Sequence, residues 1–181
     1  TRDYVRAMTV VLPTGEITHF GSTVSKTSSG YSLTNLMVGS EGTLGIITEL
    51  TLKLIPAPKA TVSLIAPYED LDACISTVPK VFMNHFKPQA VEFFEKEILI
   101  SSEEYLGKQV FPRKVDGVEA GAYLLLTFDG DSMDELDPIV ERAAEMLVEE
   151  GALDVLIADT APKLKDAWAA RSSFLEGIEE Q

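Results

Sequence analysis

The sequence contains few residues of several chemically informative kinds. Its 181 residues include one cysteine, two histidines and one tryptophan. A single cysteine excludes an internal disulfide and is typical of a reducing compartment. The histidines, His19 and His85, are far apart in sequence, and no Cys/His cluster has metal-ligand spacing, so we expect no metal site within this chain. Basic residues are also scarce. Fifteen Lys and Arg against 29 Asp and Glu give a net charge of −14, which disfavours nucleic-acid binding.

Long hydrophobic runs are missing as well. The run Val10-Val11-Leu12 is far too short for a signal-peptide core or a transmembrane segment, and residues 1–4 are polar. We therefore expect a cytoplasmic protein without a transmembrane segment. The composition, 45% hydrophobic and 24% charged, is that of an ordinary globular protein and excludes a disordered or collagen-like chain.

The chain divides near Pro56-Ala57-Pro58, which predicts domains over 1–57 and 58–181. In the first part we expect strands over 7–12, 17–20 and 46–55, a loop over 21–32 and one helical turn over 33–38. In the strand over 46–55, the alternate residues Ile46, Thr48, Leu50, Leu52 and Leu54 are the more apolar set, so we expect them to be buried.

The second part has a distinctive order of elements. Strands are expected over 60–66, 90–94, 123–129 and 154–158. The first helix covers 71–83, with Asp70 as its N-cap and Pro79 disturbing its middle. The second follows a Ser132/Glu135 capping box and ends at Gly151. A short helix over 95–105, an irregular insertion over 107–121 and a helix after Thr160 complete the part. The order β-α-β-β-α-β is that of a ferredoxin-like domain, and the fold class is α+β.

The segment Gly39-Ser40-Glu41-Gly42-Thr43-Leu44-Gly45 carries the strongest chemical signal. Glycines at three-residue intervals permit positive φ angles and let backbone N–H groups approach a flat or anionic ligand. The segment matches neither the P-loop nor the dinucleotide-binding motif, and it precedes a strand rather than a helix. A tight connection that needs glycine for its geometry is the alternative interpretation.

Several segments together resemble one family in order and spacing. They are Arg2-Asp3-Tyr4-Val5, residues 9–16 (TVVLPTGE), Lys26 with residues 30–36 (GYSLTNL), and residues 38–49 (VGSEGTLGIITE). This pattern is similar to the FAD-linked oxidases of the vanillyl-alcohol oxidase type, near the glycolate oxidase flavoprotein subunit and the D-lactate dehydrogenases. The resemblance covers essentially the whole chain, more loosely between Pro58 and Leu156. Family members usually have Asp where this chain has Ser32.

The resemblance implies the last segment of an FAD-binding lobe over 1–57 and part of a ferredoxin-like cap over 58–181. It implies that FAD is the cofactor. Carried over residue by residue, the cofactor contacts are Glu41, Gly42, Gly45, Ile46 and Ile47.

Residues 167–171, AWAAR, resemble the family's W-x-x-R motif, which makes Arg171 the residue that binds a substrate carboxylate. A guanidinium offers a planar fork of donors that matches a carboxylate. The alternative is a solvated helix residue with a local acidic partner such as Glu176. Trp168 is expected to pack in a core. Cys74 shares a helical stripe with Leu71 and Val78, which favours a buried, inert thiol.

Family members are much longer, so we expect this chain to be an internal fragment that lacks the loop around the FAD pyrophosphate. The full-length protein is expected to oxidise a D-2-hydroxy acid such as D-lactate or glycolate by hydride transfer to flavin. Its electron acceptor is an electron-transfer flavoprotein, an iron–sulfur subunit, quinone or oxygen. No catalytic residue is assigned within this chain, which alone is expected to be inactive and to hold FAD weakly. The alternatives are a non-oxidative FAD enzyme of the ether-lipid synthase type and a non-catalytic acidic interaction module.

Overall fold

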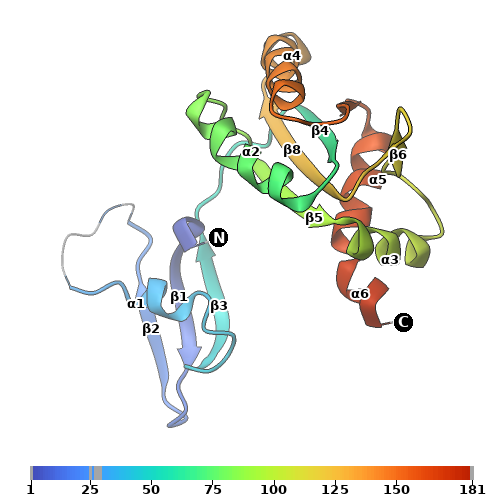
Figure 1. Cartoon of the computed structure of the whole chain (residues 1–181). Coiled ribbons are helices and arrows are strands. Elements are labelled where there is room, and N and C mark those ends of the chain that lie inside the picture. The colour runs from blue at the N-terminus through green and yellow to red at the C-terminus, as the bar shows by residue number, and fades with distance from the viewer. Residues whose placement is uncertain (1, 25, 27–29, 180–181) are drawn as a thin grey trace. The chain divides into compact units, whose positions relative to one another are not determined.

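The computed structural model describes residues 2–24, 26 and 30–179, and the chain forms two compact units, Thr1–Ala57 and Pro58–Gln181 (Figure 1). Part of the loop expected over 21–32, residues 25 and 27–29, lies outside the described residues.

The first unit is a three-stranded antiparallel sheet with one short helix. After a 3-10 turn, η1 (Arg2–Tyr4), come β1 (Val5–Val11), β2 (Ile17–Gly21), α1 (Leu33–Met37) and β3 (Ile46–Leu52). The strand order is β2-β1-β3, so β1 is central and both other strands are edges. A small core of Met8, Val10 and Met37 lies between the sheet and α1. All three expected strands and the helical turn are present.

The burial expected for β3 is wrong. Every residue of β3 is exposed, including Ile46 at 68%, Leu50 at 50% and Leu52 at 51%. The pairing of β1 with β3 also shifts between Thr9/Glu49 and Val10/Ile47, which leaves Thr48 as an extra residue. Because this bulge reverses the alternation, Ile46 points to the opposite face from Leu50. The small helix α1 does not cover β3, which explains why its apolar side chains stay exposed.

The second unit contains a four-stranded antiparallel sheet of order β5-β8-β4-β9. Its elements are β4 (Ala60–Tyr68), α2 (Leu71–Met83), β5 (Ala90–Glu95), α3 (Lys96–Leu106), β8 (Ala122–Gly130), α4 (Met133–Glu149), β9 (Leu156–Ala158), α5 (Ala161–Ser172) and α6 (Phe174–Glu179). A two-residue hairpin, β6 (Lys114–Val115) with β7 (Val118–Glu119), lies in the expected insertion. Thus β4-α2-β5-β8-α4-β9 confirms the β-α-β-β-α-β order and the α+β class.

Helices α2 and α4 cover one face of this sheet (Figure 1). Their core joins Val81 of α2 and Leu147 of α4 to Leu64 and Leu126 of the central strands. The opposite face carries a second core, which includes Tyr123, Phe94, Leu99 of α3 and Ala170 of α5. Each face therefore has its own hydrophobic core, as expected for a sheet covered on both sides.

The caps explain where the helices begin. Asp70 accepts a hydrogen bond from the Ala73 N–H at 2.8 Å, and Ser132 accepts one from the Glu135 N–H at 3.3 Å. The expected helix over 71–83 has those bounds, and Pro79 lies inside it without ending it. Gly151, at φ +98, follows the C-cap of α4 as expected.

Candidate functional site

The glycine-rich segment forms the turn that joins α1 to β3. The N–H of Ser40 donates to the Met37 carbonyl at 3.1 Å, and the N–H of Thr43 donates to the Ser40 carbonyl at 3.0 Å. The Thr43 hydroxyl donates to the same carbonyl at 2.7 Å. Glu41 adopts φ +50, a left-handed conformation that is uncommon for a non-glycine residue and occurs often at functional sites.

The glycines of this turn are of two kinds. A Cβ atom on Gly45 would lie 2.8 Å from the Val10 side chain and 2.8 Å from the Val11 carbonyl oxygen, so packing against β1 requires glycine there. A Cβ on Gly42, at φ +80, would meet no atom within 4 Å. A tight connection that needs glycine for its geometry therefore explains Gly45. The surface over Gly42, in contrast, is open to a ligand.

The five residues assigned to the cofactor lie in one continuous segment. Glu41 and Gly42 are exposed in the turn, Gly45 is buried beneath it, and Ile46 and Ile47 begin β3 as exposed residues. The turn leaves backbone open at Gly42, and the first residues of the edge strand are exposed, with Ile46 and Ile47 on opposite faces of the sheet. Open backbone beside an apolar side chain suits a flat, nucleotide-bearing cofactor. Direct contact with a cofactor stays a prediction for all five.

Ser32, which replaces the family's usual Asp, is the N-cap of α1. Its hydroxyl accepts a hydrogen bond from the Asn35 N–H at 3.4 Å. Serine and aspartate are both favoured N-caps. The departure from the family pattern therefore preserves the start of this helix.

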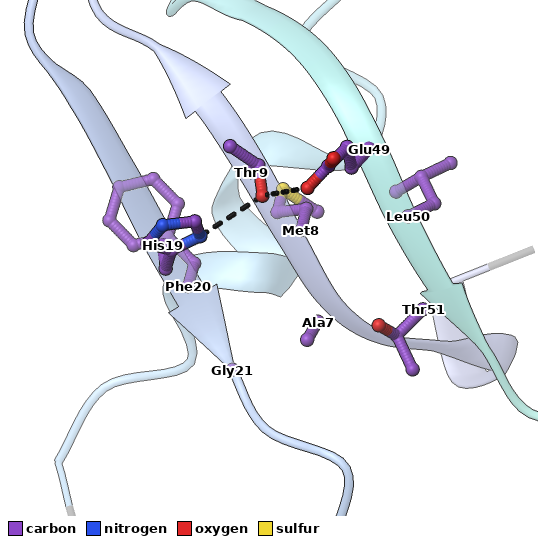
Figure 2. Close-up of a pocket in the computed structure, with 9 residues that line it drawn as sticks. All are labelled: Ala7, Met8, Thr9, His19, Phe20, Gly21, Glu49, Leu50 and Thr51. Carbon is purple, nitrogen blue, oxygen red and sulfur yellow. Dashed lines mark hydrogen bonds between the residues drawn. The ribbon is translucent and has the colours of Figure 1, made fainter.

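One face of the three-stranded sheet holds a polar cluster that the sequence did not reveal. A hollow of ≈ 260 Å³ there is lined by residues of all three strands, and Figure 2 shows Thr9 between His19 and Glu49. The Thr9 hydroxyl donates to Glu49 Oε2 at 2.8 Å and lies 3.0 Å from His19 Nδ1. Because that hydroxyl has one proton, Nδ1 of His19 must be the donor in the second bond. Only the strand register, which pairs Thr9 with both residues, could have revealed this cluster.

Arg171 lies in the last turn of α5, in the second unit. Its Nη2 is 3.3 Å from Glu92 Oε1 and 3.2 Å from Glu92 Oε2. Glu176, the local partner suggested by the alternative interpretation, is therefore not the acid that Arg171 contacts. Nε of Arg171 is buried without a hydrogen-bond partner among the described residues. Trp168 packs against the neighbouring hydrophobic core, as expected.

A buried carboxylate organises the insertion after α3. Glu103, 3% exposed, accepts hydrogen bonds from the N–H groups of Val110 and Phe111 at 2.6 and 2.8 Å, and it pairs with Arg113. Tyr123 adds a hydrogen bond from its hydroxyl to the Pro112 carbonyl at 2.8 Å. Nothing in the sequence singles out Glu103, because an acidic residue in a helix usually faces solvent and no local pattern indicates its loop partners.

Cys74 is buried, and burial raises the pKa of its thiol to about 12. The structure thus confirms the expected burial of Cys74, and a protonated thiol is a poor nucleophile at neutral pH. Across residues 2–24, 26 and 30–179, no three His, Cys, Asp or Glu side chains are grouped so as to hold a metal ion. Within the same residues, no helix is long and apolar enough to span a membrane.

Residues 57–181 match the family model described as FAD linked oxidases, C-terminal domain. The chain therefore belongs to the FAD-linked oxidase family, as the motifs had indicated. Among curated relatives, it is 66% identical to D-lactate dehydrogenase of Anaerostipes hadrus over 179 residues, which is 99% of this chain and 38% of the relative. It is 35% identical to glycolate oxidase subunit GlcD of Bacillus subtilis (strain 168), covering 98% of this chain and 36% of that protein. The chain thus spans little more than a third of these relatives.

Solved structures share the fold at lower identity. An alkyldihydroxyacetonephosphate synthase matches with a TM-score of 0.60 and 19% identity over 98% of this chain and 32% of that one. A substrate-bound p-cresol methylhydroxylase matches with a TM-score of 0.62 and 16% identity over 93% of this chain and 37% of that one. At such identities, the matches establish the architecture and leave substrate and reaction open.

Proposed function

We propose that this chain is part of an FAD-dependent dehydrogenase that oxidises a D-2-hydroxy acid, D-lactate or glycolate, to the 2-oxo acid. The observation that carries the proposal is the 66% identity to a D-lactate dehydrogenase over 99% of this chain. In this assignment, unit Thr1–Ala57 contributes a segment of the FAD-binding lobe, and unit Pro58–Gln181 contributes part of the cap over the substrate.

The residues proposed to hold FAD are Glu41, Gly42, Gly45, Ile46 and Ile47. The open surface over Gly42 and the exposed start of β3 fit such a group. FAD, when bound, supplies the redox chemistry by accepting a hydride from the α-carbon of the hydroxy acid. This chain contributes binding and orientation, since close positioning of reactants accounts for much of an enzyme's rate.

Arg171 is proposed to bind the carboxylate of the hydroxy acid. Its Nη1 makes no hydrogen bond with any described residue, so part of the guanidinium fork remains available. A guanidinium stays charged at every relevant pH and fits a carboxylate with two parallel hydrogen bonds. The base that removes the hydroxyl proton is proposed to lie outside this chain.

The test uses a full-length protein that contains this chain, assayed with D-lactate and glycolate and a dye acceptor. Arg171→Lys keeps the charge but loses the fork, so kcat/KM should fall by about 10²-fold. Arg142→Lys is the matched control, because Arg142 packs over Phe86 beside the other hydrophobic core. Equal effects of the two changes, or a full-length protein without flavin, would refute the proposal.

The electron acceptor is proposed to be a separate protein, an electron-transfer flavoprotein or an iron–sulfur subunit. The support is that one relative, GlcD, is named as a subunit of glycolate oxidase. The proposed location is the cytoplasm, in keeping with the single buried cysteine. Affinity purification of the full-length protein from the soluble fraction should recover a redox partner, whereas recovery of the protein alone from a secreted fraction would contradict both points.

A further inference from the structure

The partner of Arg171 comes from a distant part of the chain. Glu92 is in β5, opposite Leu125 of β8, and it lies two residues before the buried Phe94. Side chains two residues apart in a strand share a face, so Glu92 is on the side of the sheet covered by α5. The fold therefore brings this carboxylate to Arg171 across 79 positions of sequence.

Both Glu92 oxygens approach the same nitrogen, Nη2, at 3.3 and 3.2 Å. If Glu92 took the place of the substrate carboxylate, its two oxygens would accept hydrogen bonds from two different nitrogens of the guanidinium in parallel. Here Nη1 pairs with no described residue, and Nε is buried without a partner. The guanidinium is thus held at Nη2 and enclosed at Nε, while Nη1 remains free to donate.

The exposure of the ion pair indicates that it does little for stability. The side chain of Arg171 is 42% exposed and that of Glu92 is 32% exposed. Solvent and salt screen pairs of this kind, and ordering two long side chains costs entropy, so their net contribution is small. An orienting function accounts for the contact better than a stabilising one.

We infer that Glu92 is a positioning residue, which fixes Nη2 of Arg171 so that Nη1 and the second proton of Nη2 are presented together to the substrate carboxylate. This inference rests on the proposed function, in which Arg171 binds that carboxylate. The inference concerns how the fork is oriented, and Glu92 itself touches no reacting atom.

Three variants test the inference in a full-length protein that contains this chain. Glu92→Ala removes the acceptor, so KM for the hydroxy acid should rise about tenfold, with a smaller change in kcat, because a mispositioned fork binds the acid poorly. Glu92→Gln keeps an amide oxygen that accepts from Nη2, so KM should stay within about threefold of wild type. Glu95→Gln is the matched control, because Glu95 is exposed on the same strand, outside any described ion pair, and KM should not change.

A second measurement needs neither flavin nor turnover. In the 181-residue chain, NMR of the Arg171 guanidinium should show slow rotation about Cζ–Nη2 in wild type and Glu92→Gln, and fast rotation in Glu92→Ala. Dispersed backbone amide resonances in the same samples establish separately that each variant is folded. Rotation that is equally fast in all three proteins would overturn the inference.

The outcomes separate the two proposals. If both Glu92 variants lower KM, Glu92 competes with the substrate and the inference is wrong. If Arg171→Lys raises KM while Glu92→Ala does not, the inference fails and the proposed function stands. If Arg171→Lys leaves KM unchanged, the carboxylate role of Arg171 itself fails.

Discussion

Tyr68 and Tyr123 are both fully buried in the four-stranded sheet, yet only the second of the two has a partner for its hydroxyl. Tyr123 donates to the Pro112 carbonyl at 2.8 Å. Tyr68 Oη has no hydrogen-bond partner among the described residues, and the proton of the nearby Thr77 hydroxyl is donated to the Ala73 carbonyl at 3.0 Å. The two residues therefore form a natural comparison of a satisfied and an unsatisfied buried hydroxyl.

Phenylalanine at each position should give opposite results. Tyr123→Phe leaves the Pro112 carbonyl unpaired and should lower the free energy of unfolding by about 1 kcal/mol. Tyr68→Phe removes an unpaired buried group without creating a cavity, so stability should be unchanged or higher by about 1 kcal/mol. Urea unfolding of the chain measures both. A larger loss for Tyr68→Phe than for Tyr123→Phe would contradict this account.

Stability should fall in alkaline solution. Burial raises the pKa of Tyr68 to about 12 from 10.0 and that of Cys74 to about 12 from 9.0. Since the folded state keeps both groups protonated while the unfolded state ionises first, their contribution is complete below about pH 9 and is lost as pH rises toward 12. The free energy of unfolding, measured at several pH values between pH 7 and pH 11, should fall less steeply with pH for Cys74→Ala and for Tyr68→Phe than for wild type. Identical slopes in all three proteins would show that these groups are not responsible.

Replacement of Glu103 should destabilise the second unit. Glu103→Ala leaves Arg113 without its buried partner and two backbone N–H groups without an acceptor, so the expected loss is about 3 kcal/mol. Glu104→Ala is the control, because Glu104 is the exposed neighbour on the same helix, and its effect should stay within about 0.5 kcal/mol. Thermal unfolding followed by circular dichroism compares them. Similar melting temperatures would argue against a structural function for Glu103.

Gly15 and Gly42 have similar backbone geometry. Alanine variants at the two positions therefore distinguish the effect of backbone strain from the loss of a ligand contact. Gly15 has φ +85 and Gly42 has φ +80, and a Cβ on either would meet no atom within 4 Å. Alanine at each should cost about 1 kcal/mol of stability, because left-handed backbone is unfavourable with a side chain. In a full-length protein, flavin fluorescence titration should show weaker FAD binding for Gly42→Ala alone. Equal FAD affinity in both variants would remove Gly42 from the proposed cofactor site.

Local signals in the sequence predicted most of the elements. Asp70 and Ser132 are strong N-caps before amphipathic stretches, and the helices begin where these residues place them. Thr160 precedes α5 as expected, but its side chain makes no capping hydrogen bond. The α+β class followed from the order of elements, which restricts the topology to few solutions.

Features that depend on strand register could not be predicted in the same way. The bulge at Thr48 reverses which alternate residues of β3 share a face of the sheet, and no local sequence pattern around Thr48 predicts it. The pairing of Glu92 with Arg171 joins residues on elements separated by most of the second unit. Glu176, five residues further along the chain, is a local candidate from sequence alone, and tertiary packing brings Glu92 to Arg171 in its place.

The exposed position of β3 has a practical consequence for anyone who expresses this chain alone. An edge strand with free backbone groups and apolar side chains such as Ile46 and Leu50 is a template for intermolecular pairing. The acidic surface, with its net charge of −14, opposes such self-association through mutual repulsion. High salt weakens that repulsion, so concentrated, salt-rich solutions are where aggregates should first form.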